Sequence, residues 1–238
     1  MTGTFLNVIT VVIGSLLGLL LGGRLPERLR QTVMSALGLF TLAFGFSLFI
    51  KTQNSLVVLA SLLVGVLLGE WWQVEAGIQK LGVWLERRFT RPADPESPTD
   101  HRFARGFFIT SLLFCVGPMA ILGSIQDGLT GNFETLAIKS ILDGFAALAF
   151  ASSLGLGVAF SALPVLIYQG SITLLAAQVE TLVTEAMMTE LTAVGGVLLI
   201  AIAISSLLEI RPIRVGNFLP ALLAAPFVVA LFTWINLY

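Results

Sequence analysis

The stretch Ala137-Ile-Lys-Ser-Ile-Leu-Asp-Gly-Phe-Ala-Ala-Leu-Ala-Phe150 places a lysine and an aspartate inside an apolar run. Lys139 and Asp143 are four residues apart, so on a helix they share one face. The chain around them is apolar enough to belong in a lipid bilayer, where ionisable groups are costly unless they are paired or hydrated. This stretch therefore predicts a membrane fold and, within it, a functional site.

The composition of the whole chain supports a polytopic membrane protein. Of its 238 residues, 11% are charged, whereas soluble domains carry about 25%. The formal net charge of -1 argues against nucleic acid as a partner. One histidine, His101, cannot build a zinc site, and one cysteine, Cys115, cannot form an intramolecular disulfide. We expect the protein to need no cofactor.

The apolar runs predict an all-α integral membrane protein, because a helix of about 20 apolar residues spans the hydrocarbon core. We predict one transmembrane domain over residues 1–238 with eight spans, at 4–23, 32–50, 55–73, 104–123, 134–155, 157–177, 191–209 and 217–236. Residues 74–89 have apolar side chains on one face, which predicts an amphipathic helix lying in the membrane interface. Residues 90–103 are rich in proline and charge and predict a flexible cytoplasmic loop.

The distribution of charge predicts the orientation of the chain, because lysine and arginine concentrate in cytoplasmic loops. With the N-terminus outside, every lysine and arginine except Lys51 and Lys139 falls in an inner loop. The outer loops then hold acidic residues, namely Asp127, Glu134, Glu180 and Glu185. We therefore predict that both termini lie outside, on the periplasmic side.

Glycine patterns suggest how the helices pack. Residues 7–22 align without gaps with residues 54–69, which indicates either an internal repeat, as in many transporter folds, or a shared Leu/Gly-rich composition. The aligned pairs include Asn7 with Asn54, Gly18 with Gly65 and Gly22 with Gly69. Small residues spaced every four positions let helix backbones approach closely. Such a stripe serves contacts within the chain or, alternatively, the seam of a homodimer.

Asp143 is the centre of the predicted site. It follows Glu134 by nine residues, which places it roughly 13 Å inside the span, close to the midplane. Pro118, preceded by Gly117, and Pro164 interrupt the spans on either side, and discontinuous helices around a midplane site are typical of transporters. Ordinary proline kinks are the alternative. The predicted substrate-binding residues are Asp143, Lys139, Asp127, Ser124, Gln126, Gly117, Pro118, Ser140, Tyr168 and Gln169.

These residues predict a secondary transporter or passive pathway for a small ion or polar solute. Asp143 would bind a cation or relay a proton, and Lys139 would compete for the carboxylate. The alternative is a non-transporting scaffold or partner subunit, packed through glycine stripes, with a closed Lys–Asp pair. The chain has no nucleophile elbow, HExxH motif or P-loop, so we do not expect an enzyme.

Long motifs also carry a resemblance to a known family. They are Phe-Cys-Val-Gly-Pro-Met-Ala-Ile-Leu-Gly-Ser-Ile-Gln-Asp-Gly over 114–128, Lys-Ser-Ile-Leu-Asp-Gly over 139–144 and Leu-Pro-Val-Leu-Ile-Tyr-Gln-Gly over 163–170. Together with both ends of the chain, they resemble the bacterial YqgA/YdfK-type integral membrane proteins, a domain of unknown function. The resemblance implies a location in the bacterial inner membrane and supplies neither a substrate nor functional residues.

Overall fold

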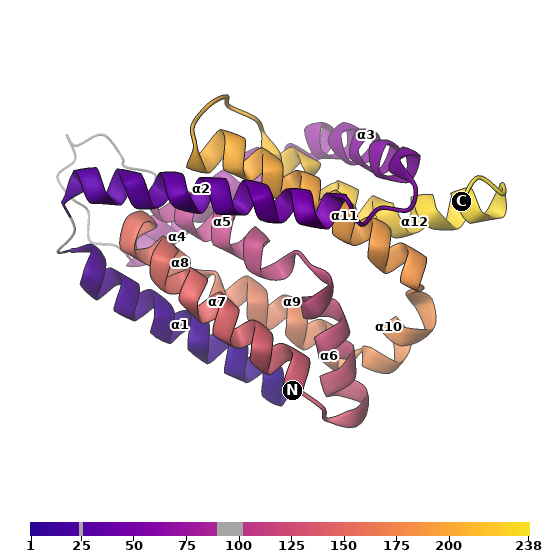
Figure 1. Cartoon of the computed structure of the whole chain (residues 1–238), viewed down its shortest axis with the longest axis horizontal. Helices are drawn as coiled ribbons and strands as arrows, with labels where there is room; N and C mark the ends of the chain where they lie inside the picture. Colours follow the sequence, from indigo (N-terminus) through magenta and orange to yellow (C-terminus); the bar gives the residue numbers. More distant parts are fainter. Residues whose placement is uncertain (24–25, 90–101) are drawn as a thin grey trace. The chain divides into compact units, whose positions relative to one another are not determined.

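The computed structural model describes residues 1–23, 26–89 and 102–238, and every regular element in these ranges is helical (Figure 1). The elements are α1 (Thr2–Gly22), α2 (Glu27–Phe49), α3 (Ser55–Trp72), α4 (Val74–Phe89), α5 (Arg102–Cys115), α6 (Pro118–Thr130), α7 (Glu134–Leu154), α8 (Gly157–Phe160), α9 (Ala162–Leu174), α10 (Ala176–Leu182), α11 (Glu185–Ile202), the π-helix η1 (Ala203–Leu207), the 3₁₀-helix η2 (Val215–Phe218) and α12 (Pro220–Trp234).

The predicted all-helical membrane fold is confirmed. In the described part of the chain, seven helical segments are long and apolar enough to cross a membrane, and α5 with α6 makes an eighth if this bent pair forms one span. The helix that carries the predicted seventh span starts six residues before the predicted residue 191. The helix begins at Glu185, because the side chain of Thr184 caps it by accepting a hydrogen bond from the Met187 amide.

The predicted fourth span, 104–123, is broken between α5 and α6, where Gly117 and Pro118 predicted an interruption. Helices α5 and α6 meet at a bend of 61°. Gly117 between them has φ +130°, a backbone conformation that glycine adopts without strain. Helix α6 continues to Thr130, so Asp127 lies within a helix and not in an outer turn.

The predicted sixth span is also divided, at Ser161 between α8 and α9. Pro164 falls in the first turn of α9, where the missing N–H of proline removes no helical hydrogen bond. Residues Gly157–Leu174 still make one segment that is long and apolar enough to cross a membrane.

The segment after α3 contains the predicted helix, whereas the predicted loop differs from the structure at its C-terminal end. Helix α4 covers the predicted residues 74–89, and its place in the membrane interface stays a prediction. Most of the predicted flexible loop, 90–101, lies outside the described residues. Arg102 and Phe103 belong to α5 and not to a loop.

The chain groups into two compact units, each described here by itself, and the single predicted domain over 1–238 stays a prediction. The first unit contains Met1–Leu37, Gly77–Cys115 and Met119–Ala176, and the second contains Gly38–Ala76, Val116–Pro118 and Ala177–Tyr238.

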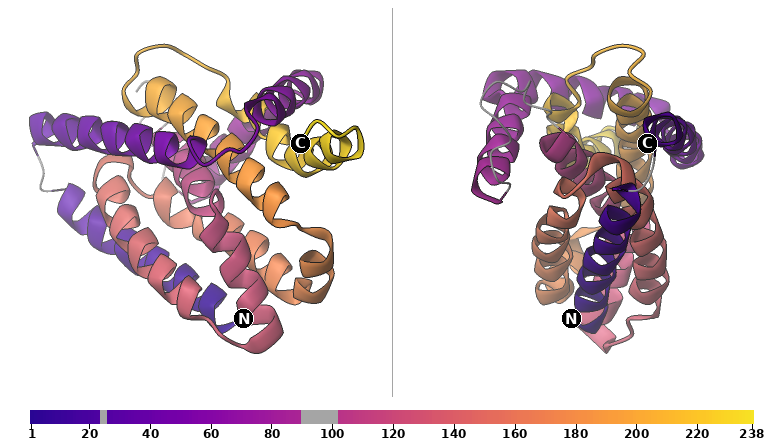
Figure 2. Two further views of the ribbon diagram at one scale, coloured as in Figure 1. Left: turned by 45° about the vertical axis from the view of Figure 1, so that its right-hand side comes forward. Right: turned by 90° about the vertical axis from the view of Figure 1, so that its left-hand side faces the viewer.

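In the first unit, α1 and α7 lie side by side along most of their length (Figure 2). A methyl group on Gly14 would overlap the carbonyl oxygen of Gly144, and one on Gly22 would overlap that of Ser152. Because residue numbers rise together along the contact, the two helices run parallel. The glycine stripe of α1 is thus used for close packing within the chain.

In the second unit, α3 packs against α11 and α12. Gly65 meets Ala221 and Gly69 meets the carbonyl oxygen of Asn217, so α3 and α12 run antiparallel. Val58, Ala193, Val194, Leu198, Ala221 and Ala225 form the buried core of this unit. Both stripes serve contacts within their own unit, and the homodimer stays a prediction that these glycines no longer support.

Candidate functional site

Lys139 and Asp143 form an ion pair on the buried face of α7. The Lys139 ammonium donates to Oδ2 of Asp143, and the two side chains are 7% and 11% exposed. A charge-assisted hydrogen bond of this kind is strong. Removing both charges from water is costly, however, so burial of the pair is weak evidence for a purely stabilising role.

Two amide side chains from other helices complete the surroundings of the pair. Asn7 of α1 donates through Nδ2 to Oδ2 of Asp143 at 3.0 Å and to Oε1 of Gln169, on α9, at 3.3 Å. Both amide side chains are fully buried. Asn7, Lys139, Asp143 and Gln169 are called the polar cluster below. The sequence aligned Asn7 with Asn54 but did not predict its contact with Asp143.

The polar cluster has more hydrogen-bonding atoms than partners. Oδ1 of Asn7 and Nε2 of Gln169 are buried and find no hydrogen-bond partner among the described residues. Lys139 has three donors, and Asp143 supplies its only acceptor in this part of the chain. Buried polar groups are nearly always paired with protein or water. Atoms of this kind are ordinarily paired by ordered water or by a bound polar species.

Asp127 of α6 lies at the N-terminal end of α1. Its Oδ2 accepts hydrogen bonds from the Gly3 amide at 3.0 Å and lies 3.1 Å from the amine of Met1. A carboxylate is stabilised there by the unpaired amides of the first helical turn. One turn earlier on α6, Ser124 is fully buried, and its hydroxyl has no partner among the described residues.

The end of α5 lies near the charge pair. Cys115, its last residue, lies in the neighbourhood of Lys139 and Asp143. Tyr168 of α9, partly buried, lies in the neighbourhood of Cys115. Gly117 and Pro118 belong to the second unit, so their predicted part in the site stays a prediction.

Two other predicted residues are engaged elsewhere. Ser140 is buried on α7, but its hydroxyl donates to the Leu136 carbonyl of its own helix at 2.6 Å. Gln126 accepts a hydrogen bond from Thr135 at 2.8 Å in an exposed position. Among the ten predicted site residues, the structure thus joins Asp143 and Lys139 directly and connects Gln169 to them through Asn7.

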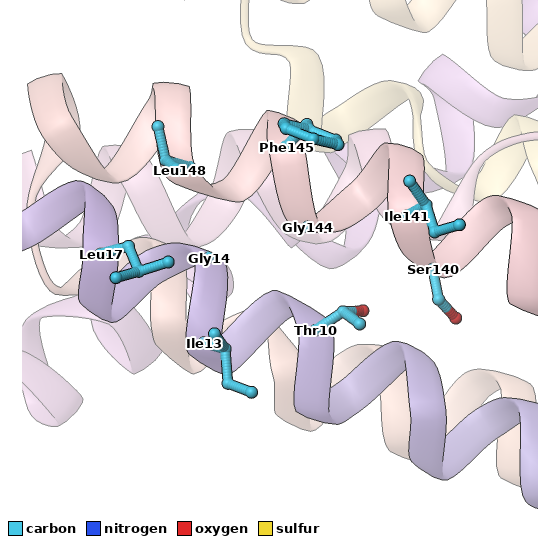
Figure 3. Close-up of a pocket in the computed structure, with 9 residues that line it drawn as sticks. All are labelled: Thr10, Ile13, Gly14, Leu17, Ser140, Ile141, Gly144, Phe145 and Leu148. Atoms are coloured by element: carbon cyan, nitrogen blue, oxygen red, sulfur yellow. The ribbon is translucent and has the colours of Figure 1, made fainter.

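An apolar groove of about 270 Å³ follows the seam between α1 and α7 on the outside of the first unit (Figure 3). Its lining residues are Thr10, Ile13, Gly14, Leu17, Ser140, Ile141, Gly144, Phe145 and Leu148. The Thr10 hydroxyl donates to the Asn7 carbonyl, so both hydroxyls in the groove are used within their own helices. The groove therefore offers no ligand for an ion and fits an apolar chain better.

The sequence analysis missed Glu190, the fully buried carboxylate of the second unit. It accepts hydrogen bonds from the Thr52 hydroxyl at 2.6 Å and from the amides of Gln53 and Asn54 at 2.8 and 3.1 Å. Tyr238 adds a fourth donor at 3.2 Å. Starting the span at residue 191 left Glu190 out. The repeat offset was a signal, since 54 − 7 and 190 − 143 both equal 47.

Comparisons with known proteins agree with the membrane fold. The family model described as a protein of unknown function, DUF554, matches residues 2–230. The chain belongs to the DUF554 family. It is 36% identical over 223 residues to the uncharacterized protein YqgA of Escherichia coli (strain K12), covering 94% of each chain.

A second relative matches the chain over a similar length. The chain is 30% identical over 233 residues to the uncharacterized membrane protein YdfK of Bacillus subtilis (strain 168), covering 96% of each chain. No solved structure matches the chain. The resemblance seen in the sequence motifs is thereby confirmed, and the chain is a membrane protein of this family.

Proposed function

We propose that the protein is a secondary transporter or passive pathway for a small ion or polar solute, with the polar cluster as its binding site. One observation carries the proposal. The Lys139–Asp143 pair is buried beside two amide groups, on α1 and α9, that retain unpaired polar atoms. Ionisable groups at membrane depth are rare, and they usually mark an ion or substrate pathway.

The polar cluster suits an exchange of cations at Asp143. The Lys139 ammonium already neutralises the carboxylate, so an incoming cation or proton must displace or release it. Asn7 and Gln169 provide neutral amide oxygens and N–H donors. These groups can hydrogen-bond within the cluster whether Asp143 is paired with Lys139 or holds a cation or proton. The bend between α5 and α6 lets helix ends move beside the site, as in transporters with discontinuous helices.

The setting of this site is proposed from the sequence. The charge distribution supports both termini outside, and the family resemblance supports the bacterial inner membrane. The partners in this proposal are the lipid bilayer and the transported species, with a homodimer as a further possibility. No catalytic role or cofactor is included, since no catalytic motif is present in the sequence.

The second candidate is a non-transporting scaffold or partner subunit. The closed Lys139–Asp143 ion pair favours it, because a purely structural pair is expected to stay closed. The unpaired atoms of Asn7 and Gln169 weigh against it, since a structural core normally satisfies its polar groups. The two candidates differ in whether the polar cluster binds anything.

A thermal-shift screen followed by flux measurements separates these candidates. Purified protein is tested with cations, anions and small zwitterions across pH, as wild type, as Asp143→Asn and as Ser15→Ala. Ser15 is a matched control, because it is fully buried on α1 and bonded only to its own helix. We expect a ligand to raise the melting temperature of wild type and Ser15→Ala but not of Asp143→Asn.

Flux into proteoliposomes should follow the same order. The transport proposal is wrong if no species shifts the wild type and if Asp143→Asn leaves every measured flux unchanged.

A further inference from the structure

We propose that the polar cluster is reached by a proton path that runs along α1 from Asp127 to Asp143, and that the transported or coupled ion is a proton. This inference rests on the proposed function and assigns its substrate and its side of access. It is built from contacts within the first unit alone.

Three buried polar contacts follow one another along the first two turns of α1, and we call them the polar file. Gly3 contacts Asp127 through its amide, and Asn7 contacts Asp143. Between them, the hydroxyl of Thr4 lies 3.3 Å from that of Thr173 on α9. Four residues of helix separate Gly3 from Asn7, so the file covers about 6 Å along the axis. The threonine hydroxyls thus lie between the two carboxylates along α1, with gaps on either side that the path must bridge.

Three buried polar atoms on α1, α6 and α9 have no hydrogen-bond partner among the described residues. They are Oγ of Ser124 on α6, Oδ1 of Asn7 on α1 and Nε2 of Gln169 on α9, and all three side chains are fully buried. Oδ1 of Asn7 needs a donor, Nε2 of Gln169 needs an acceptor, and the Ser124 hydroxyl can use either, so one kind of partner serves all three only if it both donates and accepts. Water meets this requirement in protein interiors. Water molecules bonded to these atoms would link the threonine hydroxyls and carboxylates into a path for protons.

A proton fits the polar cluster better than a metal ion. The Lys139 ammonium occupies Asp143 and repels a metal cation, while a proton binds to the carboxylate oxygen itself. Among the described residues, no group of three His, Cys, Asp or Glu side chains could hold a metal. The cluster therefore has the composition of a protonation site.

The transfer step balances with one proton and no other reactant. A water in the path gives up one O–H bond to Asp143, whose carboxylate gains that proton, and the water regains a proton from the Asp127 side. The net charge of the pair rises from zero to +1, and Lys139 is released from a formal ion pair. The other groups facing Asp143 are Asn7 and Cys115, with Tyr168 beside Cys115.

The polar file ends at the cluster. On α1 the next buried residue after Asn7 is Val11, which has no exposed surface. On α7 the next buried residues after Asp143 are Ala147, Phe150 and Ala151, and the buried Ser152 and Ser153 follow only near the far end of the helix. Protons beyond the cluster therefore meet an apolar stretch on each helix, Val11 on α1 and Ala147 to Ala151 on α7, which would act as the barrier on that side. Access from one side at a time is what alternating access requires.

Cysteine labelling tests the path independently of transport. Cys115 is the only cysteine of the chain, so Cys115→Ser provides a background without thiols. Ser124→Cys and Val11→Cys are then compared, because both positions are fully buried. A small, membrane-impermeant thiol reagent should modify Ser124→Cys at least about tenfold faster, and only from the side of the N-terminus. Equal rates, or labelling from the other side, would overturn the path.

Proton flux tests the assignment of the ion. Proteoliposomes that contain a pH dye are subjected to a membrane potential. We expect proton flux in wild type, none in Asp143→Asn, a roughly tenfold loss in Asp127→Asn and recovery in Asp127→Glu. A positioned proton-transfer group contributes about 10²–10⁴-fold, and the loss at Asp127 is smaller because water in the path substitutes for it in part. Melting temperatures of the variants identify any that fail to fold.

The outcomes separate the inference from the proposed function. If Asp143→Asn loses flux while Asp127→Asn keeps it and Ser124→Cys resists labelling, the path is wrong and the transport proposal stands. A flux of another ion that depends on Asp143 without protons overturns the proton assignment alone. If wild type conducts neither protons nor any other species tested, both proposals fail.

Discussion

The two units each bury one carboxylate beside an asparagine, and they complete its hydrogen bonds in different ways. Asp143 in the first unit receives a lysine and one amide, next to polar atoms without partners. Glu190 in the second unit receives four donors, none of them from a cationic side chain. Both lie the same number of positions after their asparagine, Asn7 or Asn54.

The difference teaches which buried charge is structural. Glu190 belongs to α11, and its carboxylate lies at the start of α3. The unpaired amides and the positive end of the helix dipole stabilise a carboxylate there. Its oxygens are well supplied with donors, so little capacity remains for a ligand. Asp143 lies within a span, away from a helix end, and keeps unpaired amide atoms beside it. We therefore assign Glu190 to stability and Asp143 to function.

The largest expected effect is on transport, in the double variant Lys139→Met/Asp143→Leu. Replacing a buried ion pair with apolar side chains of similar volume is often neutral or stabilising, by about 1–4 kcal/mol. We expect an unchanged or higher melting temperature together with complete loss of ligand binding and flux. Measuring both quantities on one preparation checks this. Loss of stability together with retained flux would reverse the assignment of Asp143.

The next effect is on stability, in Glu190→Ala. This change leaves the Gln53 amide without its acceptor and removes one of the two acceptors of the Asn54 amide, the other being the Thr52 hydroxyl. We expect it to cost about 3 kcal/mol of unfolding free energy. Glu185→Ala is the matched control, because Glu185 is an exposed acid on the same helix. Denaturant unfolding in detergent measures both variants. A stable Glu190→Ala protein that has lost transport would show that the second unit also carries a functional carboxylate.

The smallest effect concerns Tyr238 at high pH. Partial burial, together with the charge of Glu190 and the hydrogen bond to it, raises the pKa of Tyr238 to about 12 from an ordinary value of 10.0. The fold therefore favours the protonated phenol. The stabilisation it adds is complete below pH 10 and is lost as the pH rises towards 12.

A phenolate absorbance titration compares wild type with Tyr238→Phe and with Glu190→Gln. The Tyr238 signal should appear late in wild type and earlier in Glu190→Gln, because the neutral amide no longer opposes ionisation. A Tyr238 signal near pH 10 in wild type would contradict the contact with Glu190.

The sequence predicted the spans because hydrophobicity is a local property. Eight apolar runs were recognisable without tertiary information, and the spacing of Lys139 and Asp143 predicted their shared helix face. The errors occurred where local polarity misleads. Glu185 and Glu190 made the start of α11 look like a loop, although one caps a helix dipole and the other is a buried acceptor.

The partners of each charge were beyond the reach of sequence patterns. Asn7 is 136 positions from Asp143 and 162 from Gln169, so no periodicity connects them. Ser140 and Gln169 looked equivalent as polar residues within spans. The structure separates them, because Ser140 bonds to its own helix while Gln169 faces Asn7.

The sequence by itself determined that this chain is a helical membrane protein and that α7 carries a lysine one turn before an aspartate. Both follow from local physics, namely transfer of apolar segments into lipid and the pitch of a helix. Only the tertiary structure decided which charge has complete hydrogen bonding. For Asp143, the hydrogen bond from Asn7 depends on the close approach of α1 to α7 at Gly14. Packing between segments far apart in the chain sets that distance.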